Sequence, residues 1–425
     1  MKSVLDYFKI ISKIPRCSFK TEKMKAFLIE EAKKINYEVS TDEAGNVLCQ
    51  KGTPKICLQS HYDMVCIGKA PHLELIQEGT VLRAKDSTLG ADNGMGVCMM
   101  LYCMQKYENL ECLFTSDEEV GLIGATELEL PLVAPYILNL DGEDENEIYT
   151  GCAGGVDMEA VIDLVFEGLS PDAKVYEIKV MGLPGGHSGV EIDKNIASSI
   201  KVMARFLSQC RGEMISFGAG ERRNSIAKHA RVIFTSCDTI QSDDAHIVVT
   251  EIKNTFSKKI QNSKVIIKTL HAFPQGVRSW NRDYGIPEDS INLGLVEMNE
   301  TQLKIILSLR FLNDHSAEVL VGETRAFFEL CGFCAEVLSS HVAWTPMIGK
   351  FSEKVKEIVS KHIPSAQFKA IHAGLECGIL LSNCAQVKEA ISIGPNIKSP
   401  HSTGEACDLD SVDRITKAVE EIIAL

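Results

Sequence analysis

Histidine and acidic residues gather in five short segments of this 425-residue sequence, and metal binding is the chemistry that these residue types support. The segments are HYD at 61–63, ADNG at 91–94, DEE at 117–119, DGE at 141–143 and PHS at 400–402. Histidine nitrogens combined with carboxylate oxygens suit zinc, with cobalt or manganese as substitutes. If one carboxylate is shared, the set can hold two ions about 3.5 to 4 Å apart. Jointly, the five segments predict such a metal site.

Each segment alone also has an ordinary explanation. His61 could be a surface histidine, although the two-residue period of a strand places Asp63 on the same side, where its carboxylate can orient the imidazole. Asp92 could simply cap the glycine-rich helix that follows it. The acids 117–119 could form a solvated turn, but directly after an apolar strand their charges repel unless a cation or a proton relieves them. Beyond Asp141, the acidic run resembles a solvated loop.

The adjacent acids Glu118 and Glu119 indicate a mechanism, because one can bind metal while the other takes a proton from water. No other nucleophile is required. The sequence has no GxSxG motif, no P-loop and no GxGxxG after a strand, and GADNGMG has the wrong spacing for a dinucleotide-binding turn.

The elements around these segments predict an α/β fold with a mostly parallel central sheet, because helical and strand patterns alternate. The predicted strands 55–60, 111–116 and 136–140 each precede one of the acidic or histidine segments. The carboxyl ends of such strands are where α/β sheets place their ligands. The predicted helices of this part are 4–14, 21–35 and 93–107.

The pattern changes near residue 173, which predicts an inserted α+β lid domain made of two related halves. We expect residues 1–172 and 348–425 to form one discontinuous catalytic domain, and residues 173–347 to form the lid. Within the lid, the pattern predicts a helix at 245–258 and a strand at 264–270.

Composition excludes several classes of protein. The net charge of −14 argues against nucleic-acid binding, because a phosphate backbone requires a basic surface. No apolar run approaches the roughly 20 residues that cross a bilayer, which predicts no membrane interaction. Fifteen cysteines without an export signal predict a reducing cytoplasm, in which most are buried thiols. The pair Cys331 and Cys334 has no second CxxC partner, which disfavours a zinc or redox role.

Longer motifs carry a resemblance to a known family. The sequence resembles the aminoacyl-histidine dipeptidase branch of the co-catalytic zinc peptidase family, which also contains aminoacylases, carboxypeptidase G and tripeptidases. The resemblance spans nearly the whole chain, and HAGLECG and SIGPxIKxPHS are specific for the dipeptidase branch. The motifs are HYDMV, DSTLGADNGMG, TSDEEVGLIGA, LDGE, GCAGG, GLPGGHSG, HAGLECG and IGPNIKSPHS.

The resemblance implies a role for each candidate in the catalytic domain. One zinc would bind His61, Asp92 and Asp141, and the other would bind Asp92, Glu119 and His401. Asp63 would orient His61, Glu118 would act as general acid and base, and the Asp92–Asn93 peptide bond would be cis.

The resemblance also implies substrate contacts. His187 of the lid would polarise the scissile carbonyl, and lid closure would exclude water from the reaction. Arg310 matches an arginine that binds the substrate carboxylate, although it could also pair with an acid of the lid. Asn224 matches an Asn-x-Ile-Pro segment in which Ala227 here replaces the proline. Glu376 would touch the substrate's amino end, with a helix cap as the alternative.

Together these features predict a cytoplasmic metallo-dipeptidase with two zinc ions, acting on unblocked dipeptides such as Xaa-His. The alternatives are an N-acyl amino acid deacylase or a tripeptidase with the same metals, and a metal-loaded binding protein that has lost catalysis. The last is disfavoured because Glu118, which such a protein could lose, is present. The sequence leaves open the side-chain preference, the native metal and the choice between monomer and homodimer.

Overall fold

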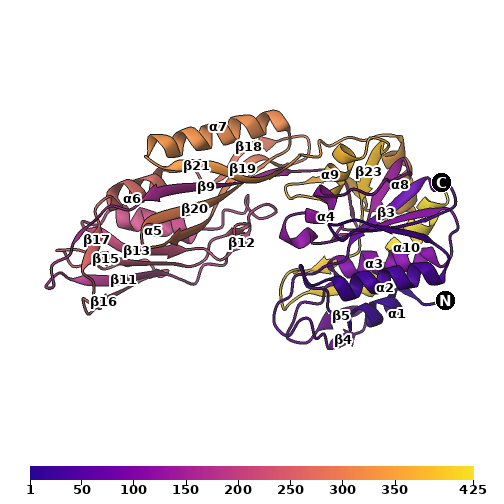
Figure 1. The fold of residues 1–425 in the computed structure, drawn as a ribbon, viewed down its shortest axis with the longest axis horizontal. Helices are drawn as coiled ribbons and strands as arrows, with labels where there is room; N and C mark the ends of the chain where they lie inside the picture. The colour runs from indigo at the N-terminus through magenta and orange to yellow at the C-terminus, as the bar shows by residue number, and fades with distance from the viewer. The chain divides into compact units, whose positions relative to one another are not determined.

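The computed structural model describes residues 1–425, and the chain divides into two compact units. Unit 1 comprises residues 1–152, 344–370 and 374–425, and unit 2 comprises residues 153–343 and 371–373. Figure 1 shows unit 1 in the indigo, purple and yellow of the two chain ends and unit 2 in the colours of the middle of the chain. The first boundary lies at 152/153 and not at the predicted 172/173. The reason is that β9 (Gly154–Asp163) pairs with strands of unit 2.

An eight-stranded sheet forms the centre of unit 1, in the order β1-β2-β6-β3-β7-β23-β8-β22. Its middle strands β6, β3, β7 and β23 are parallel, whereas β1, β2 and β8 pair in antiparallel fashion. The mixed α/β class with a mostly parallel sheet is therefore confirmed. The strand bounds are β1 Glu38–Thr41, β2 Val47–Lys51, β6 Leu110–Thr115, β3 Ile56–His61, β7 Tyr136–Asn139, β23 Glu389–Ser392, β8 Glu147–Cys152 and β22 Gln367–Ile371.

Helix α3 (Ala91–Met104) is the most buried helix of unit 1, since all its residues except Tyr102 are buried. It packs against β3 and against α1, which explains why its sequence lacks the polar face of a surface helix. The remaining helices of unit 1 are α1 Val4–Ile11, α2 Glu22–Lys34, α4 Ile123–Thr126, α8 Lys350–His362, α9 Glu376–Asn383 and α10 Leu409–Ile423.

A small antiparallel sheet in unit 1 joins the end of the chain to its beginning. Its order is β24 (Ile397–Lys398), β25 (Ala406–Asp408), β5 (Val81–Ala84) and β4 (Leu75–Glu78). This pairing fixes the loop between β24 and β25, which carries His401.

Unit 2 is built on a nine-stranded antiparallel sheet, and two strand groups meet at the single residue pair Ala219 and Val296. Its helices are α5 Ser199–Ser208, α6 Ser263–Ala272 and α7 Asp314–Leu330. Its strands run in the order β16 Ile247–Ile252, β11 Val175–Val180, β15 Ala230–Thr235, β13 Glu213–Ala219, β19 Ile286–Met298, β20 Gln302–Phe311, β9 and β21 Cys334–His341, and β18 Gly276–Asn281 pairs with β19.

Two elements of unit 2 are the reverse of the prediction. The predicted helix at 245–258 contains strand β16 and ends at the first residue of β17 (Lys258–Ile260), and the predicted strand at 264–270 lies inside helix α6. The segment IVVTEI is rich in β-branched residues and forms a sheet edge, whereas in α6 the buried residues Ile266, Ile267 and Leu270 recur at helical spacing. None of the helices has both the length and the apolar character needed to span a bilayer.

Candidate metal centre and substrate-binding residues

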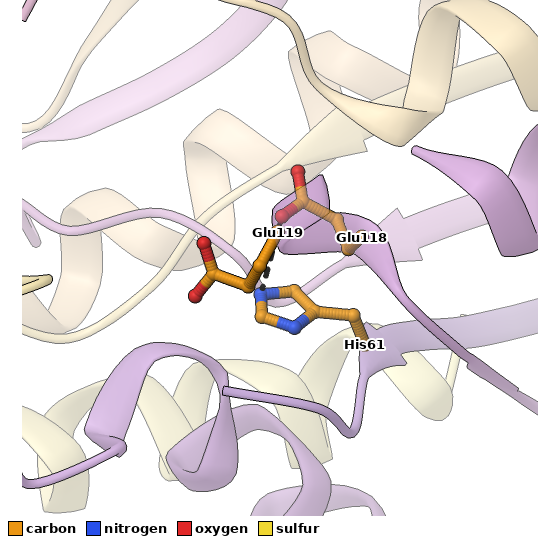
Figure 2. Close-up of side chains that lie close together, drawn as sticks. All are labelled: His61, Glu118 and Glu119. Carbon is orange, nitrogen blue, oxygen red and sulfur yellow. Dashed lines mark ion pairs between the residues drawn. The ribbon is translucent and has the colours of Figure 1, made fainter. Parts of the chain in front are cut away.

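Three parallel strands bring three of the five predicted metal ligands, His61, Glu119 and Asp141, to one edge of the sheet of unit 1. Strand β3 ends at His61, β6 is followed by the turn that carries Glu118 and Glu119, and Asp141 lies two residues after β7. Figure 2 shows the two glutamates from this turn next to the His61 imidazole. The carboxyl ends of parallel strands lie at the same sheet edge. This grouping was therefore predictable from sequence, because each of these segments follows a predicted strand.

The five residues predicted to bind metal form two groups that share Asp92. In the first group, His61 Nε2 lies 3.2 Å from Asp92 Oδ1 and 3.3 Å from Asp141 Oδ1. In the second group, His401 Nε2 lies 2.9 Å from Asp92 Oδ2 and 2.8 Å from Glu119 Oε2. The two oxygens of Asp92 therefore face different histidines, which is the arrangement a bridging carboxylate requires.

The capping alternative for Asp92 does not describe the structure. Helix α3 has Gly90 at its N-cap, and among the first side chains of the helix it is Asn93 that accepts a hydrogen bond from it, with Oδ1 3.1 Å from the Gly96 amide. The Asp92–Asn93 peptide bond is cis, as the resemblance implied.

Asp63 connects His61 to the turn that carries the two glutamates. Its Oδ1 lies 3.3 Å from His61 Nδ1 and also accepts a hydrogen bond from the Glu118 amide at 3.1 Å. Its Oδ2 accepts from Ser18 Oγ at 2.8 Å and from the Glu119 amide at 3.4 Å. The carboxylate thus orients the imidazole and holds the turn at the same time.

Negative charge dominates this site. Burial raises the pKa of the Glu119 carboxyl to about 7, and the charge of Asp92 adds to the effect. Burial likewise raises the pKa of Glu118 well above its usual value, with Glu119 and Asp141 as further causes. For His401, burial acts to lower the pKa, but hydrogen bonds to Asp92 and Glu119 outweigh it and raise the pKa to about 12.

The residues present fit a metal centre. Glu119 Oε1 and Asp141 Oδ1 are buried without a hydrogen-bond partner, and buried carboxylates are costly unless a cation or a proton compensates them. In both groups the imidazole and carboxylate ligand atoms all lie within 4.8 Å of one another. Glu118 is also near, with its Oε2 4.0 Å from His61 Nε2. The solvated-turn alternative is disfavoured because the side chains of Glu118 and Glu119 are only 15% and 4% exposed.

Glu376 is the first residue of α9 and is fully buried. Its Oε2 accepts hydrogen bonds from Thr115 Oγ1 at 2.8 Å and from Gln59 Nε2, while its Oε1 has no hydrogen-bond partner. It makes no capping hydrogen bond at the start of its own helix. Burial raises its pKa to about 7, so the group lies in an environment that favours the neutral acid or a nearby cation.

In unit 2, His187 is held in one tautomer. Its Nδ1 accepts hydrogen bonds from the backbone amides of Gly189 at 3.1 Å and Val190 at 3.2 Å, so the ring proton lies on Nε2. Nε2 is therefore a hydrogen-bond donor, as an oxyanion-stabilising role demands. The exposed Asn224 lies beside this loop, because Ser225 pairs with His187 and the Asn224 carbonyl accepts from the Ser188 amide at 2.9 Å.

Arg310 is a buried residue of β20, and it lies in a cluster that contains two further histidines. A Cβ atom placed on Gly189 would lie 3.0 Å from Arg310 Nε and 3.1 Å from His187 Cε1, so this loop contacts the arginine. Across the sheet, Gly155 pairs with both Arg310 and His341. Ser290 also pairs with Arg310, and its Oγ lies 2.8 Å from His372 Nε2.

The two histidines of this cluster are adapted to a positive neighbour. Burial lowers the pKa of His341 to about 4 and that of His372 to about 3, and the charge of Arg310 contributes to both shifts. Sequence reasoning missed both residues. The sequence could have identified His372, because it is the first residue of the motif HAGLECG. His341, in contrast, is near Arg310 only through the pairing of β21 with β9.

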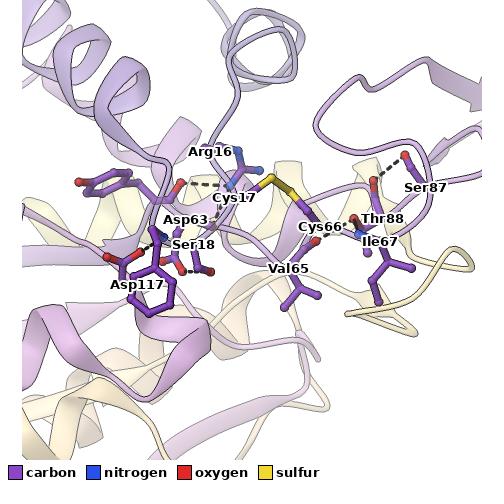
Figure 3. The surroundings of a disulfide bond; sticks show 12 residues. Arg16, Cys17, Ser18, Asp63, Val65, Cys66, Ile67, Ser87, Thr88 and Asp117 are labelled. Carbon is purple, nitrogen blue, oxygen red and sulfur yellow. Dashed lines mark hydrogen bonds between the residues drawn. A yellow bond between two sulfur atoms is a disulfide. The ribbon is translucent and has the colours of Figure 1, made fainter. Parts of the chain in front are cut away.

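Sequence reasoning also missed Arg16 and a disulfide, which lie beside the backbone of Asp63. Figure 3 shows the disulfide between Cys17 and Cys66 with Arg16 and Ser18 beside it. Arg16 is buried and donates to the carbonyl oxygens of Tyr62 at 3.3 Å and Asp63 at 3.0 Å. This disulfide is the exception to the expected thiols, and its two Cα atoms lie 5.6 Å apart, within bonding range. The other thirteen cysteines are free, and most of them are buried.

Comparison with known proteins gives relatives that match almost the whole chain. The cytosol non-specific dipeptidase of Escherichia coli (strain K12) is 29% identical, over 98% of this chain and 96% of that protein. The crystal structure of aminoacylhistidine dipeptidase from Vibrio alginolyticus superposes with a TM-score of 0.74 at 26% identity, over 98% of this chain and 96% of that one. A tripeptidase from Staphylococcus aureus shares the fold, with a TM-score of 0.57 at 16% identity over 99% of this chain and 96% of that one. No family model matches the chain.

Fold and site together define a peptidase of the α/β class whose candidate ligands lie at the strand ends. Over nearly its whole length the chain is similar to two proteins named as dipeptidases, in agreement with the resemblance that its motifs carry.

Proposed function

We propose that the protein is a metal-dependent dipeptidase that hydrolyses unblocked dipeptides, including those with a carboxyl-terminal histidine. The observation that carries this proposal is the pair of ligand groups sharing Asp92 at the carboxyl ends of β3, β6 and β7. Two relatives that match nearly the whole chain, at 29% and 26% identity, are named as dipeptidases, which supports a dipeptide as the substrate.

Two ions would be held by the chain's own residues, and we propose zinc for both. His61, Asp92 and Asp141 would hold one, and Asp92, Glu119 and His401 would hold the other. Bound there, the ions would activate water and polarise the substrate carbonyl. The mixed imidazole and carboxylate donors also suit cobalt and manganese.

Glu118 is the proposed proton carrier. It is a member of neither of the two ligand groups that share Asp92, and burial raises its pKa well above the usual value, which suits a group that accepts a proton from water. It takes the proton from the attacking water and returns it to the leaving amine. His187, with its proton on Nε2, donates a hydrogen bond to the oxygen of the scissile carbonyl.

The two charged ends of a dipeptide require groups of opposite sign. We assign the substrate carboxylate to Arg310, because its guanidinium can form a bidentate pair and the neighbouring histidines are neutral donors or acceptors. Asn224 lies beside the His187 loop, and we assign it to the carboxylate end of the substrate as well. We assign the substrate's ammonium group to Glu376, whose Oε1 is buried without a partner.

The test is a matched panel of substrates with the metal-loaded protein. A free dipeptide such as an Xaa-His compound should be cleaved, while its N-acetylated form, its C-terminal amide and the corresponding tripeptide should each lose at least about 10²-fold in kcat/KM, roughly 2.7 kcal/mol. Metal content of the purified protein, measured by mass spectrometry, should approach two ions per chain. Preferred cleavage of N-acetyl amino acids would instead indicate the deacylase, and preferred cleavage of tripeptides the tripeptidase.

A cytoplasmic location is part of the proposal, supported by the relative that is named as cytosolic. It is tested by thiol labelling of the protein in intact cells. In a reducing compartment Cys17 and Cys66 should react as thiols, whereas protection of both would place the protein elsewhere.

A further inference from the structure

A buried carboxylate outside both ligand groups binds the backbone that carries Asp92. Glu405 is only 2% exposed, and its two oxygens accept hydrogen bonds from consecutive backbone amides. Oε2 accepts from Leu89 at 2.7 Å and Gly90 at 3.0 Å, and Oε1 accepts from Ala91 at 2.7 Å and Asp92 at 3.4 Å. All four donors lie in one segment, and the segment ends at the proposed bridging ligand.

The position of Glu405 links two distant parts of the chain. The first amides of a helix have no partner within the helix, and a carboxylate there is favoured by the helix dipole. Such a carboxylate commonly comes from the preceding residues, but Glu405 comes from the loop between β24 and β25, four residues after His401. It therefore joins the segment of Asp92 to the segment of His401, although these two residues are 309 positions apart.

The segment 89–92 is also held from its other side. Arg16 donates a hydrogen bond to the Gly90 carbonyl, and the same guanidinium binds the carbonyls of Tyr62 and Asp63 beside His61. Gly90 has a φ of +68°, and a Cβ atom there would lie 2.5 Å from Arg16 Nη2, so the contact leaves no room for a side chain. The amides of the segment face Glu405 while the Gly90 carbonyl faces Arg16.

We propose that Glu405 is a positioning residue of the metal centre. By fixing the amides of residues 89–92, its carboxylate orients Asp92 so that Oδ1 faces His61 and Oδ2 faces His401. A glutamine could not replace it, because an amide offers one acceptor oxygen and directs an NH₂ group at two of the donors. This inference rests on the proposed two-metal centre, and its test reads metal binding directly, without substrate.

The chain contains a matched control for the experiment. Glu389 is also buried, and it accepts hydrogen bonds from the amides of Phe351 at 3.1 Å and Ser352 at 2.7 Å at the start of α8. None of the proposed metal ligands lies in that segment. Glu389→Gln therefore removes the same chemical group from a helix start without touching the backbone of Asp92.

The experiment compares wild type, Glu405→Gln, Glu405→Asp and Glu389→Gln. For each, Tm is measured on the metal-free protein, Zn²⁺ affinity by titration calorimetry, and coordination by the visible spectrum of the Co²⁺ form. Both glutamine variants should lower Tm. Only Glu405→Gln should weaken Zn²⁺ binding, by roughly 10- to 100-fold, and alter the Co²⁺ spectrum, as is typical for outer partners of metal ligands. Glu405→Asp keeps two acceptor oxygens and should recover part of the affinity.

Unchanged Zn²⁺ affinity and an unchanged Co²⁺ spectrum in Glu405→Gln, with a Tm loss like that of Glu389→Gln, would overturn the proposal and leave Glu405 as a helix cap. If Glu405→Gln does not fold, Glu405→Asp decides. A Zn²⁺ affinity below that of wild type or a shifted Co²⁺ spectrum then supports positioning, and wild-type values for both oppose it. Failure of the two-metal centre is a separate result, because wild type itself would then bind fewer than two ions.

Discussion

The candidate site of unit 1 and the arginine cluster of unit 2 are buried polar groups of opposite sign. In unit 1, carboxylates outnumber the histidines, and burial raises the pKa of Glu119 to about 7. In unit 2, Arg310 lies near two histidines, and burial lowers the pKa of His341 to about 4 and of His372 to about 3. The physical cause is the same, because removal from water penalises the charged form of every group.

The two regions differ in the charge of the ligand that they favour. A cluster of buried carboxylates is stabilised by a cation, whereas a buried guanidinium among neutral imidazoles is stabilised by an anion. This difference agrees with the proposed assignment of the metal ions and the substrate's ammonium group to residues of unit 1 and of the substrate's carboxylate to a residue of unit 2. The following changes test this division.

The largest effect is expected from Asp92→Ala in unit 1. Because both oxygens of Asp92 take part in ligand groups, its loss should release both ions and reduce hydrolysis to background. Metal analysis after dialysis checks this outcome. Retention of two ions would show that Asp92 does not bridge them.

Glu118→Gln should leave the metal content at the wild-type value. Since the proposed role is proton transfer, kcat should fall by roughly 10²- to 10⁴-fold. Steady-state kinetics with a free dipeptide, together with metal analysis of the same sample, measures both quantities. Activity near wild type would remove Glu118 from the mechanism.

In unit 2, Arg310→Ala should act on one end of the substrate. The free dipeptide should lose about 10²-fold in kcat/KM while its C-terminal amide changes little, so the preference for a free carboxylate collapses. Discrimination against the N-acetyl form should persist. Arg231→Ala, on the exposed face of β15, is the control and should preserve all preferences. An equal loss for the acid and the amide would refute carboxylate binding.

The smallest effect concerns the stability of unit 2 at mildly acidic pH. In the unfolded chain His372 titrates near pH 6.5, but in the folded protein its pKa is about 3. Between these values only the unfolded chain binds the proton, so the free energy of unfolding should fall as the pH decreases below 6.5. His372→Asn should make that decrease shallower in denaturant titrations from pH 7 to pH 5, whereas His315→Asn on the exposed start of α7 should not. A parallel decrease in both variants would contradict the assignment.

Much of unit 1 could be predicted from sequence because its signals are local. An apolar strand followed by acids or histidine marks a strand end, and parallel strands gather their ends at one edge, which grouped His61, Glu119 and Asp141. Unit 2 was harder to predict from sequence. A helix was predicted where β16 lies, and a strand was predicted where α6 lies. A short apolar segment with β-branched residues fits either period until its neighbours are known.

By itself, the sequence determined the α/β class, the candidate ligands and the motifs that resemble dipeptidases, because these depend on residue type and on spacing along the chain. Only the tertiary structure showed that Asp92 presents one oxygen to each histidine, that Glu405 and Arg16 hold its backbone, and that His341 and His372 surround Arg310. The last of these contacts depends on strand register, and the others join segments tens to hundreds of positions apart. A local sequence pattern does not encode contacts between residues so far apart along the chain, because the two partners meet only in the folded protein.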